Sequence, residues 1–140
     1  QLERMRGAVA VDVEDKQMRI EFRDGGGESL FVGEGTQLRP EARRLIEGVA
    51  AIMQRNRARL IIEGHSESRG PTGGTGQGLW EVSTGRAVAV RGALANAGIG
   101  DERILEVKGM GDTRLRVPED PVNPGNRRVV LVAPYDLAEP

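Results

Sequence analysis

The sequence is defined first by what it contains little of. It has 140 residues and no cysteine, which excludes disulfides and metal sites built from thiolates. It has one histidine, and this disfavours a metal site of the usual nitrogen-rich kind. Aromatic residues make up 3% of the chain and the net charge is −1, so the stacking platforms and basic faces of nucleic-acid binders are both missing. No apolar run approaches the roughly 20 residues that span a bilayer.

What is present suits a soluble globular domain. Hydrophobic residues make up 38% of the chain and charged residues 29%, and the length is sufficient for one domain with a real core. Glycine is abundant, but it gathers in expected loops and shows no repeating period. No signal peptide is visible, and the abrupt start at Gln1 is compatible with a targeting segment lying upstream.

The apolar pattern predicts four strands and two helices. Residues 18–23 alternate as in a half-buried strand, and residues 59–64, 103–108 and 127–133 also have strand patterns. Residues 40–55 and 80–97 carry apolar residues at helical spacing, with Pro40 at a first helical position and Gly98 after the second helix. Residues 9–13 fit either a strand or part of a short helix, and the pattern leaves both open.

This order of elements predicts an α/β (α+β) two-layer sandwich. A mixed sheet of about four strands would have both helices packed on one side, with at least one antiparallel pair and the apolar strand 127–133 in a central place. The domain is expected to cover residues 18–135. Residues 1–17 would form a linker or a short N-terminal helix or strand, and residues 136–140 a tail.

Arg86 is the most unusual residue of the second helix. At about 3.6 residues per turn it lies one turn from both Val82 and Val90, on an otherwise apolar face. A buried guanidinium keeps its charge and therefore needs an anion. Two structural explanations stay open, in which the head reaches solvent or a neighbouring carboxylate neutralises it. The functional alternative is that its fork binds a ligand carboxylate.

The corner after strand 59–64 supplies the complementary charge. Glu67 follows that strand at the end where α/β sheets usually bind ligands, and its carboxylate could accept hydrogen bonds from an amine. Glu67 and Arg86 together would suit a zwitterion with an amine and a carboxylate on one carbon. A solvated loop carboxylate is the structural alternative for Glu67, and a structural hydrogen bond is the alternative for His65.

Catalytic and nucleotide-binding readings are disfavoured. The glycine-rich passage 70–78 lacks the Gly-Lys-Ser/Thr ending of a phosphate-binding loop and the dinucleotide fingerprint. No serine nucleophile with a plausible base is visible. We therefore expect no enzyme activity, no cofactor and no metal.

Several segments in this order resemble the OmpA-like peptidoglycan-binding domain. They are IIEGHSESRG, WEVSTGRAVAVRGAL, GIGDERILEVKGMGDTR and PGNRRVVLV, and the similarity runs from about Met18 to Val132. Within that family, the Trp80–Ser83 segment, the glycine-rich insertion before it and EDPVNPGNRRVVLV are similar to MotB-type flagellar stator proteins. The resemblance implies a periplasmic domain that is tethered to the inner membrane by an upstream segment and is often a homodimer. It also implies a membrane ion-channel stator partner.

The resemblance also implies a ligand and a set of binding residues. The ligand would be peptidoglycan, gripped at the zwitterionic diaminopimelate of its peptide stem. The family's arginine falls on Arg86, its aspartate on Glu67 and its threonine on Ser66, and His65 stands at the strand end of the motif. The family's asparagine falls on Leu79, which cannot make the same hydrogen bonds. An alternative is therefore an OmpA-like fold that has lost wall binding and serves dimerisation or protein interaction in the periplasm.

Overall fold

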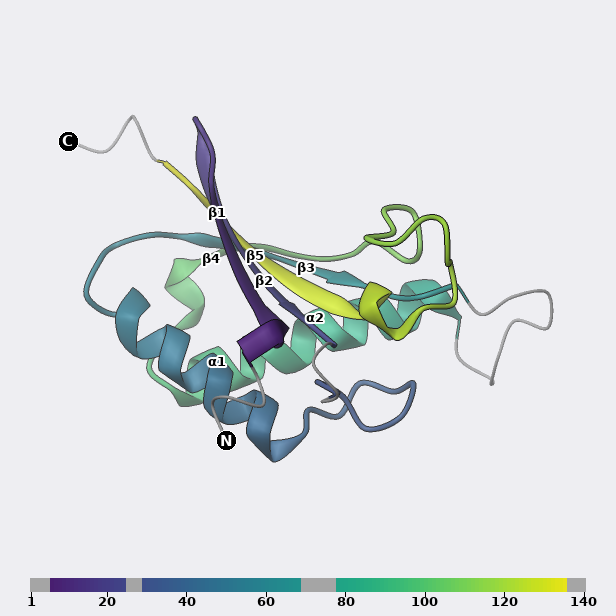
Figure 1. The fold of residues 1–140 in the computed structure, drawn as a ribbon. Coiled ribbons are helices and arrows are strands. Elements are labelled where there is room, and N and C mark those ends of the chain that lie inside the picture. The colour runs from purple at the N-terminus through teal and green to yellow at the C-terminus, as the bar shows by residue number, and fades with distance from the viewer. Residues whose placement is uncertain (1–5, 25–28, 69–77, 136–140) are drawn as a thin grey trace.

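The structure is a computed structural model that describes residues 6–24, 29–68 and 78–135. Its centre is a five-stranded sheet, and both long helices lie on one side of it (Figure 1). The strands are β1 (Val9–Val13), β2 (Gln17–Arg23), β3 (Leu60–His65), β4 (Ile104–Gly109) and β5 (Arg128–Pro134). The helices are α1 (Pro40–Met53) and α2 (Leu79–Asn96), and short 3-10 turns span Arg6–Ala8, Asp101–Arg103 and Pro124–Asn126.

The predicted two-layer architecture is confirmed, but the sheet has five strands where about four were expected. The additional strand is β1, in the segment whose pattern fitted a strand or a helix. Val9, Val11 and Val13 alternate along it, and Val11 lies opposite Ile20 in an antiparallel pairing with β2. Pairing with β2 satisfies the backbone groups on the inner edge of β1, and this decides between the two readings of the pattern.

The last strand is central, as its apolar sequence predicts. The strand order is β1-β2-β5-β3-β4, so β5 lies between β2 and β3 and runs antiparallel to both. β3 and β4 are parallel and are connected through α2. A strand that is paired on both edges and covered on one face by helices needs apolar side chains, and the residues of β5 from Arg128 to Ala133 are all buried.

The core fills the space between the sheet and the two helices. Phe22, Ile62 and Leu131 point into it from three neighbouring strands, and Ile46 of α1 and Val90 of α2 meet them there. Below β3 the packing is especially close. A Cβ atom added to Gly64 would stand 1.9 Å from the backbone oxygen of Ser83, so only glycine lets α2 approach the strand this closely.

Helix α2 ends as its sequence predicts. Gly98 has a φ of +101°, which favours glycine. The N–H of Gly98 donates to the carbonyl of Ala95, and that of Ile99 donates to Leu94, which is the Schellman pattern. This stop fixes the length of α2 and the place of Arg86 along it. Among the described residues, no helix has both the length and the apolar character needed to cross a membrane.

Candidate functional site

Arg86 lies on the buried face of α2, as predicted, and its side chain has no exposed surface. Its guanidinium is surrounded by acceptors: Nε donates to the carbonyl of Gly35 at 2.9 Å, and Nη2 donates to that of Glu34 at 2.8 Å. Nη1 donates to the carbonyl of His65 and to Oε1 of Glu67, both at 3.3 Å. The ring of Phe31 lies under the guanidinium, 5.2 Å from ring centre to Cζ. Burial of the charge is thus matched by at least four acceptors.

The fold brings the carboxylate of Glu67 next to Arg86, so the buried positive charge of Arg86 has a negative partner. The side chain of Glu67 is 3% exposed, and its second oxygen, Oε2, accepts a hydrogen bond from Nε of Arg127 at 2.9 Å. Burial by itself would raise the pKa of Glu67, but its own backbone N–H and the guanidiniums of Arg86 and Arg127 outweigh it, so the pKa lies below its ordinary value. Glu67 is therefore an ionised carboxylate held between two arginines.

Asp24 extends this cluster at the end of β2. Its Oδ1 accepts a 2.7 Å hydrogen bond from the N–H of Leu30, and its Oδ2 lies 3.6 Å from Nη1 of Arg127. Burial raises the pKa of Asp24, and the hydrogen bond from Leu30 and the charge of Arg127 only partly offset this. Oδ2 is buried and accepts no hydrogen bond from the described residues. The cluster of Asp24, Glu67, Arg86 and Arg127, which we call the charge cluster, contains two acids and two arginines.

Ser66 and His65 occupy different surroundings. Ser66 is fully buried, and its backbone N–H donates to the carbonyl of Gly111, while its hydroxyl has no hydrogen bond within the described part of the chain. His65 contributes its carbonyl to Arg86, but its ring points away. Gly64 faces α2, so the alternation along β3 turns the side chains of Glu63 and His65 to the opposite face of the sheet. The structure thus does not bring the imidazole of His65 into the charge cluster.

The imidazole of His65 sits instead in a buried polar layer. Nε2 lies 3.6 Å from Oε1 of Glu63, and Arg128 and Glu21 are the further charged groups that affect it. Burial lowers the pKa of His65, although the nearby Glu63 opposes this. The His65 contact is in turn the main influence that lowers the pKa of Glu63. Neither ring nitrogen of His65 makes a hydrogen bond within the described residues, so the structural hydrogen bond that the sequence left open for His65 is not formed there.

The loop before α1 covers the arginine. Leu30 and Phe31 are buried at 1% exposure, and a single bridge between Phe31 and Leu38 closes the loop on itself. Its carbonyls at Glu34 and Gly35 receive Nη2 and Nε, the two neighbouring groups that form the edge of a guanidinium with which a carboxylate pairs. Two backbone carbonyls thus accept the hydrogen bonds of this edge of the guanidinium.

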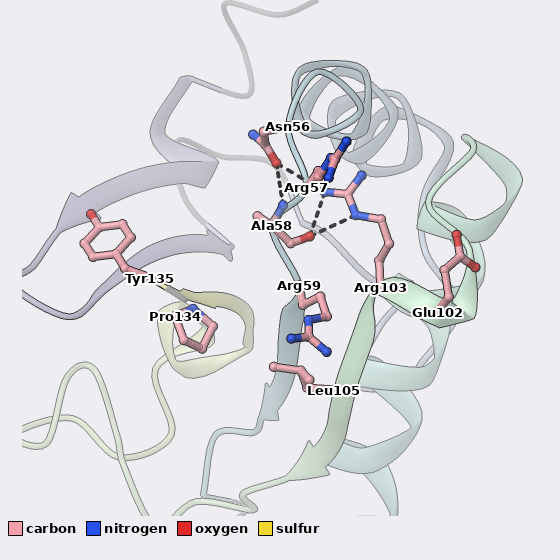
Figure 2. A pocket seen from close by; sticks show the side chains of 9 residues that line it. All are labelled: Asn56, Arg57, Ala58, Arg59, Glu102, Arg103, Leu105, Pro134 and Tyr135. Atoms are coloured by element: carbon pink, nitrogen blue, oxygen red, sulfur yellow. Dashed lines mark hydrogen bonds between the residues drawn. The ribbon is translucent and has the colours of Figure 1, made fainter. Parts of the chain in front are cut away.

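A separate cavity of about 680 Å³ lies at the other end of the sheet, where β3 and β4 begin and β5 ends (Figure 2). Arg103 borders it, and its guanidinium donates to the carbonyls of Ala58 and Met53, tying the end of α1 to β4. Leu105 reaches the cavity because a register shift in β4 turns it outward. None of the predicted site residues lines it. Within the described ranges, no group of acidic or histidine side chains is arranged to hold a metal ion.

Two members of the charge cluster, Arg127 and Asp24, did not come from sequence reasoning. Arg127 lies in the NRR segment on which the family resemblance partly rests, and that segment was the available signal for it. In the sequence Asp24 is followed by three glycines, a composition typical of turns, and the sequence does not distinguish its carboxylate from that of an ordinary turn residue. Leu79 is the first residue of α2, and no polar group replaces the family's asparagine there.

The fold is a two-layer α/β domain with a mixed sheet and both helices on one side. Comparison with known proteins identifies the family to which this fold belongs. The model of the OmpA family matches residues 30–128, about seven-tenths of the chain. The chain belongs to the OmpA family.

Its relatives include motility proteins. Motility protein B of Escherichia coli K12 is 26% identical over 139 residues, and these cover 99% of this chain and 45% of the relative. The periplasmic domain of Helicobacter pylori MotB has a TM-score of 0.78 at 18% identity, covering 94% of this chain and 84% of that one. The cell wall anchor of the T6SS from Pseudomonas aeruginosa has a TM-score of 0.76 at 22% identity, covering 94% and 90%. The resemblance to OmpA-like and MotB-type domains is confirmed, and the chain spans less than half of motility protein B.

Proposed function

We propose that this domain binds peptidoglycan without catalysis and anchors an envelope complex, a flagellar motor stator. The observation that carries the proposal is the buried pair of Glu67 and Arg86 at the exit of β3 in an OmpA-family domain. The names of related proteins support the setting, because they include a periplasmic domain of MotB and a cell wall anchor. The domain is then periplasmic and tethered to the inner membrane by an upstream segment, with an ion-channel protein as stator partner.

The ligand in this proposal is the zwitterionic end of diaminopimelate in the peptide stem. Glu67 accepts hydrogen bonds from its ammonium group, and the guanidinium of Arg86 pairs with its carboxylate. The carboxylate takes the positions now held by the carbonyls of Glu34 and Gly35, so the covering loop moves when the ligand enters. Arg127, whose side chain is 15% exposed, remains beside Glu67. Its positive charge continues to compensate the carboxylate of Glu67 while the ligand replaces the backbone carbonyls at Arg86.

Retention on purified sacculi tests the proposal. Arg86→Ala removes a fully buried side chain and needs a fold check, so Glu67→Gln is the sharper variant because it keeps the shape and loses the charge. Loss of a charged hydrogen bond weakens binding by roughly 10- to 100-fold. Arg91→Ala on the same helix is the control, since Arg91 forms an exposed pair with Asp101. Equal retention of wild type and Glu67→Gln, with both folded, contradicts the proposal.

A second candidate is the same fold without wall binding, used for dimerisation or protein interaction. Two observations favour it: the fork of Arg86 is filled by backbone carbonyls, and Leu79 has no polar group. Restoring the family residues distinguishes the two functions. If wild type is not retained but Glu67→Asp with Leu79→Asn is, the site has been lost in this chain. If wild type is retained as a monomer in sedimentation, this second function is excluded.

A further inference from the structure

The one tryptophan of the chain is unusually exposed. Trp80 is the second residue of α2 and 58% of it is exposed, although exposed single apolar residues are commonly smaller. Tryptophan is also the residue type most often found at binding hot spots. Its position is not explained by the core, because the buried face of α2 is formed by Val82, Arg86 and Val90.

The indole ring is held with one face on the backbone. A Cβ atom built on Gly111 would stand 3.4 Å from Cε3, 3.4 Å from Cζ3 and 3.5 Å from Cδ2 of Trp80. Three adjacent ring atoms at nearly equal distance place Gly111 above the ring plane, not at its edge. Gly111 has a φ of +58°, a backbone conformation that favours glycine at this position. With one face on Gly111 and more than half of the side chain exposed, the other face is open to solvent.

The same glycine connects the ring to the charge cluster. Its N–H donates to Oγ of Ser83, whose hydroxyl donates to the carbonyl of Trp80, so the backbones of Gly111 and Trp80 are linked through Ser83. Its carbonyl accepts the N–H of Ser66, the residue before Glu67. The glycine that supports the indole ring is therefore hydrogen-bonded to the corner that presents Glu67.

We propose that Trp80 is a stacking platform for a sugar ring of the peptidoglycan glycan strand. This inference rests on the proposed function, because it supplies the saccharide part of a ligand whose peptide end meets Glu67 and Arg86. One face of a pyranose carries axial C–H bonds that are polarised by the ring oxygens, and they meet the negative π-face of an indole. A flat and rigid apolar surface beside a charged site fits a ligand with both a sugar face and a zwitterionic end.

Fluorescence tests the platform directly, because Trp80 is the chain's only tryptophan. We expect soluble oligomers of N-acetylglucosamine to shift or quench its emission, and a free peptide stem that carries diaminopimelate to leave it unchanged. Trp80→Ala should weaken retention on sacculi roughly 3- to 10-fold, as expected for loss of one aromatic contact. Trp80→Phe, which keeps a flat ring, should recover most of the retention.

Ile52→Ala is the matched control, since Ile52 is an exposed apolar residue of α1. Circular dichroism and thermal unfolding show whether each variant folds. Unchanged emission with glycan oligomers, together with full retention of folded Trp80→Ala, overturns the platform. Unchanged emission and full retention are also the results expected if Trp80 contacts another protein and not a sugar ring. The proposed function fails separately, when retention is insensitive to Glu67→Gln, whatever the fluorescence titration shows.

Discussion

At the scale of single residues, Arg86 illustrates how one position can satisfy two requirements. It is fully buried, yet it stays charged because Glu67 and three backbone carbonyls accept its hydrogen bonds. The sequence left a structural and a functional reading open, and the structure shows the neutralising carboxylate of the structural reading. Under the proposed function the two readings are compatible, since the ligand carboxylate would replace the carbonyls of Glu34 and Gly35.

His65 should make stability depend on pH. Burial holds its pKa below the ordinary value of 6.5, so the unfolded chain binds a proton more readily than the fold does. The contribution of neutral His65 to the free energy of unfolding is fully present above about pH 6.5 and is lost progressively as the pH falls below this value. Urea unfolding at a series of pH values measures this loss, and His65→Gln should flatten it. A profile that is unchanged in His65→Gln would contradict the assignment.

Gly64 should not tolerate a side chain. Gly64→Ala places a Cβ atom 1.9 Å from the backbone oxygen of Ser83, so α2 must move from β3, and we expect a loss of about 3 kcal/mol or more. Gly48→Ala is the matched control in α1, where a Cβ atom meets nothing within 4 Å. That change should stabilise by roughly 0.5–1 kcal/mol. Denaturant unfolding of both variants should therefore give shifts of opposite sign.

At the scale of elements, the long loop after β4 depends on one buried side chain. Asn126 accepts the N–H of Val117 and donates to the carbonyls of Asp120 and Pro121. Pro121 in turn accepts the N–H of Ser68. The loop therefore supports the corner that carries Glu67, although its polar and proline-rich sequence only indicates an irregular segment.

Asn126→Ala should loosen this loop and the corner together. It leaves the N–H of Val117 and the carbonyls of Asp120 and Pro121, which are part-buried, without their partner, and each then costs about 1 kcal/mol, the lower end of the range for an unsatisfied group. We expect a fall of about 3 kcal/mol in the free energy of unfolding and faster hydrogen exchange at Val117 and Ser68. Asn96→Ala, at the exposed end of α2, should change neither. Unchanged exchange at Ser68 in folded Asn126→Ala would show that the corner stands without the loop.

At the scale of the whole molecule, the sheet of the described residues ends at an edge strand that pairs with no further strand. β1 is the outer strand, and Val11 and Val13 are 60% and 69% exposed. Unpaired edges of this kind can pair with another strand. Two copies of β1 in antiparallel register about Val11 would place Val9 opposite Val13 and Ala10 opposite Asp12, so that no like charges face each other.

We therefore expect the homodimer that the resemblance to MotB-type proteins implies to form through β1. Val11→Lys puts two lysines opposite each other at its centre and should convert dimer to monomer, which sedimentation equilibrium measures. Val88→Lys is the control, because Val88 is a similarly exposed residue on α2. If Val88→Lys dissociates the dimer and Val11→Lys does not, the contact lies on the helical face instead.

The sequence by itself determined the elements whose signals are local. The apolar alternation of β2, the helical spacing of α1 and α2, the glycine stop at Gly98 and the apolar run of β5 all follow from neighbouring residues. The same local reasoning identified Arg86, because a single charge on an apolar helix face is visible within two turns. Ordered motifs along the chain also identified the family.

Only the tertiary structure decided what depends on distant residues. It made residues 9–13 a strand, because β2 offered a partner for their backbone, and it assembled Asp24 and Arg127 around Glu67 from opposite ends of the chain. It turned the ring of His65 away from Arg86, because the alternation of β3 is fixed by Gly64 packing on α2. Such arrangements arise from strand pairing, helix packing and loop closure between separate segments of the chain, and they leave no local pattern.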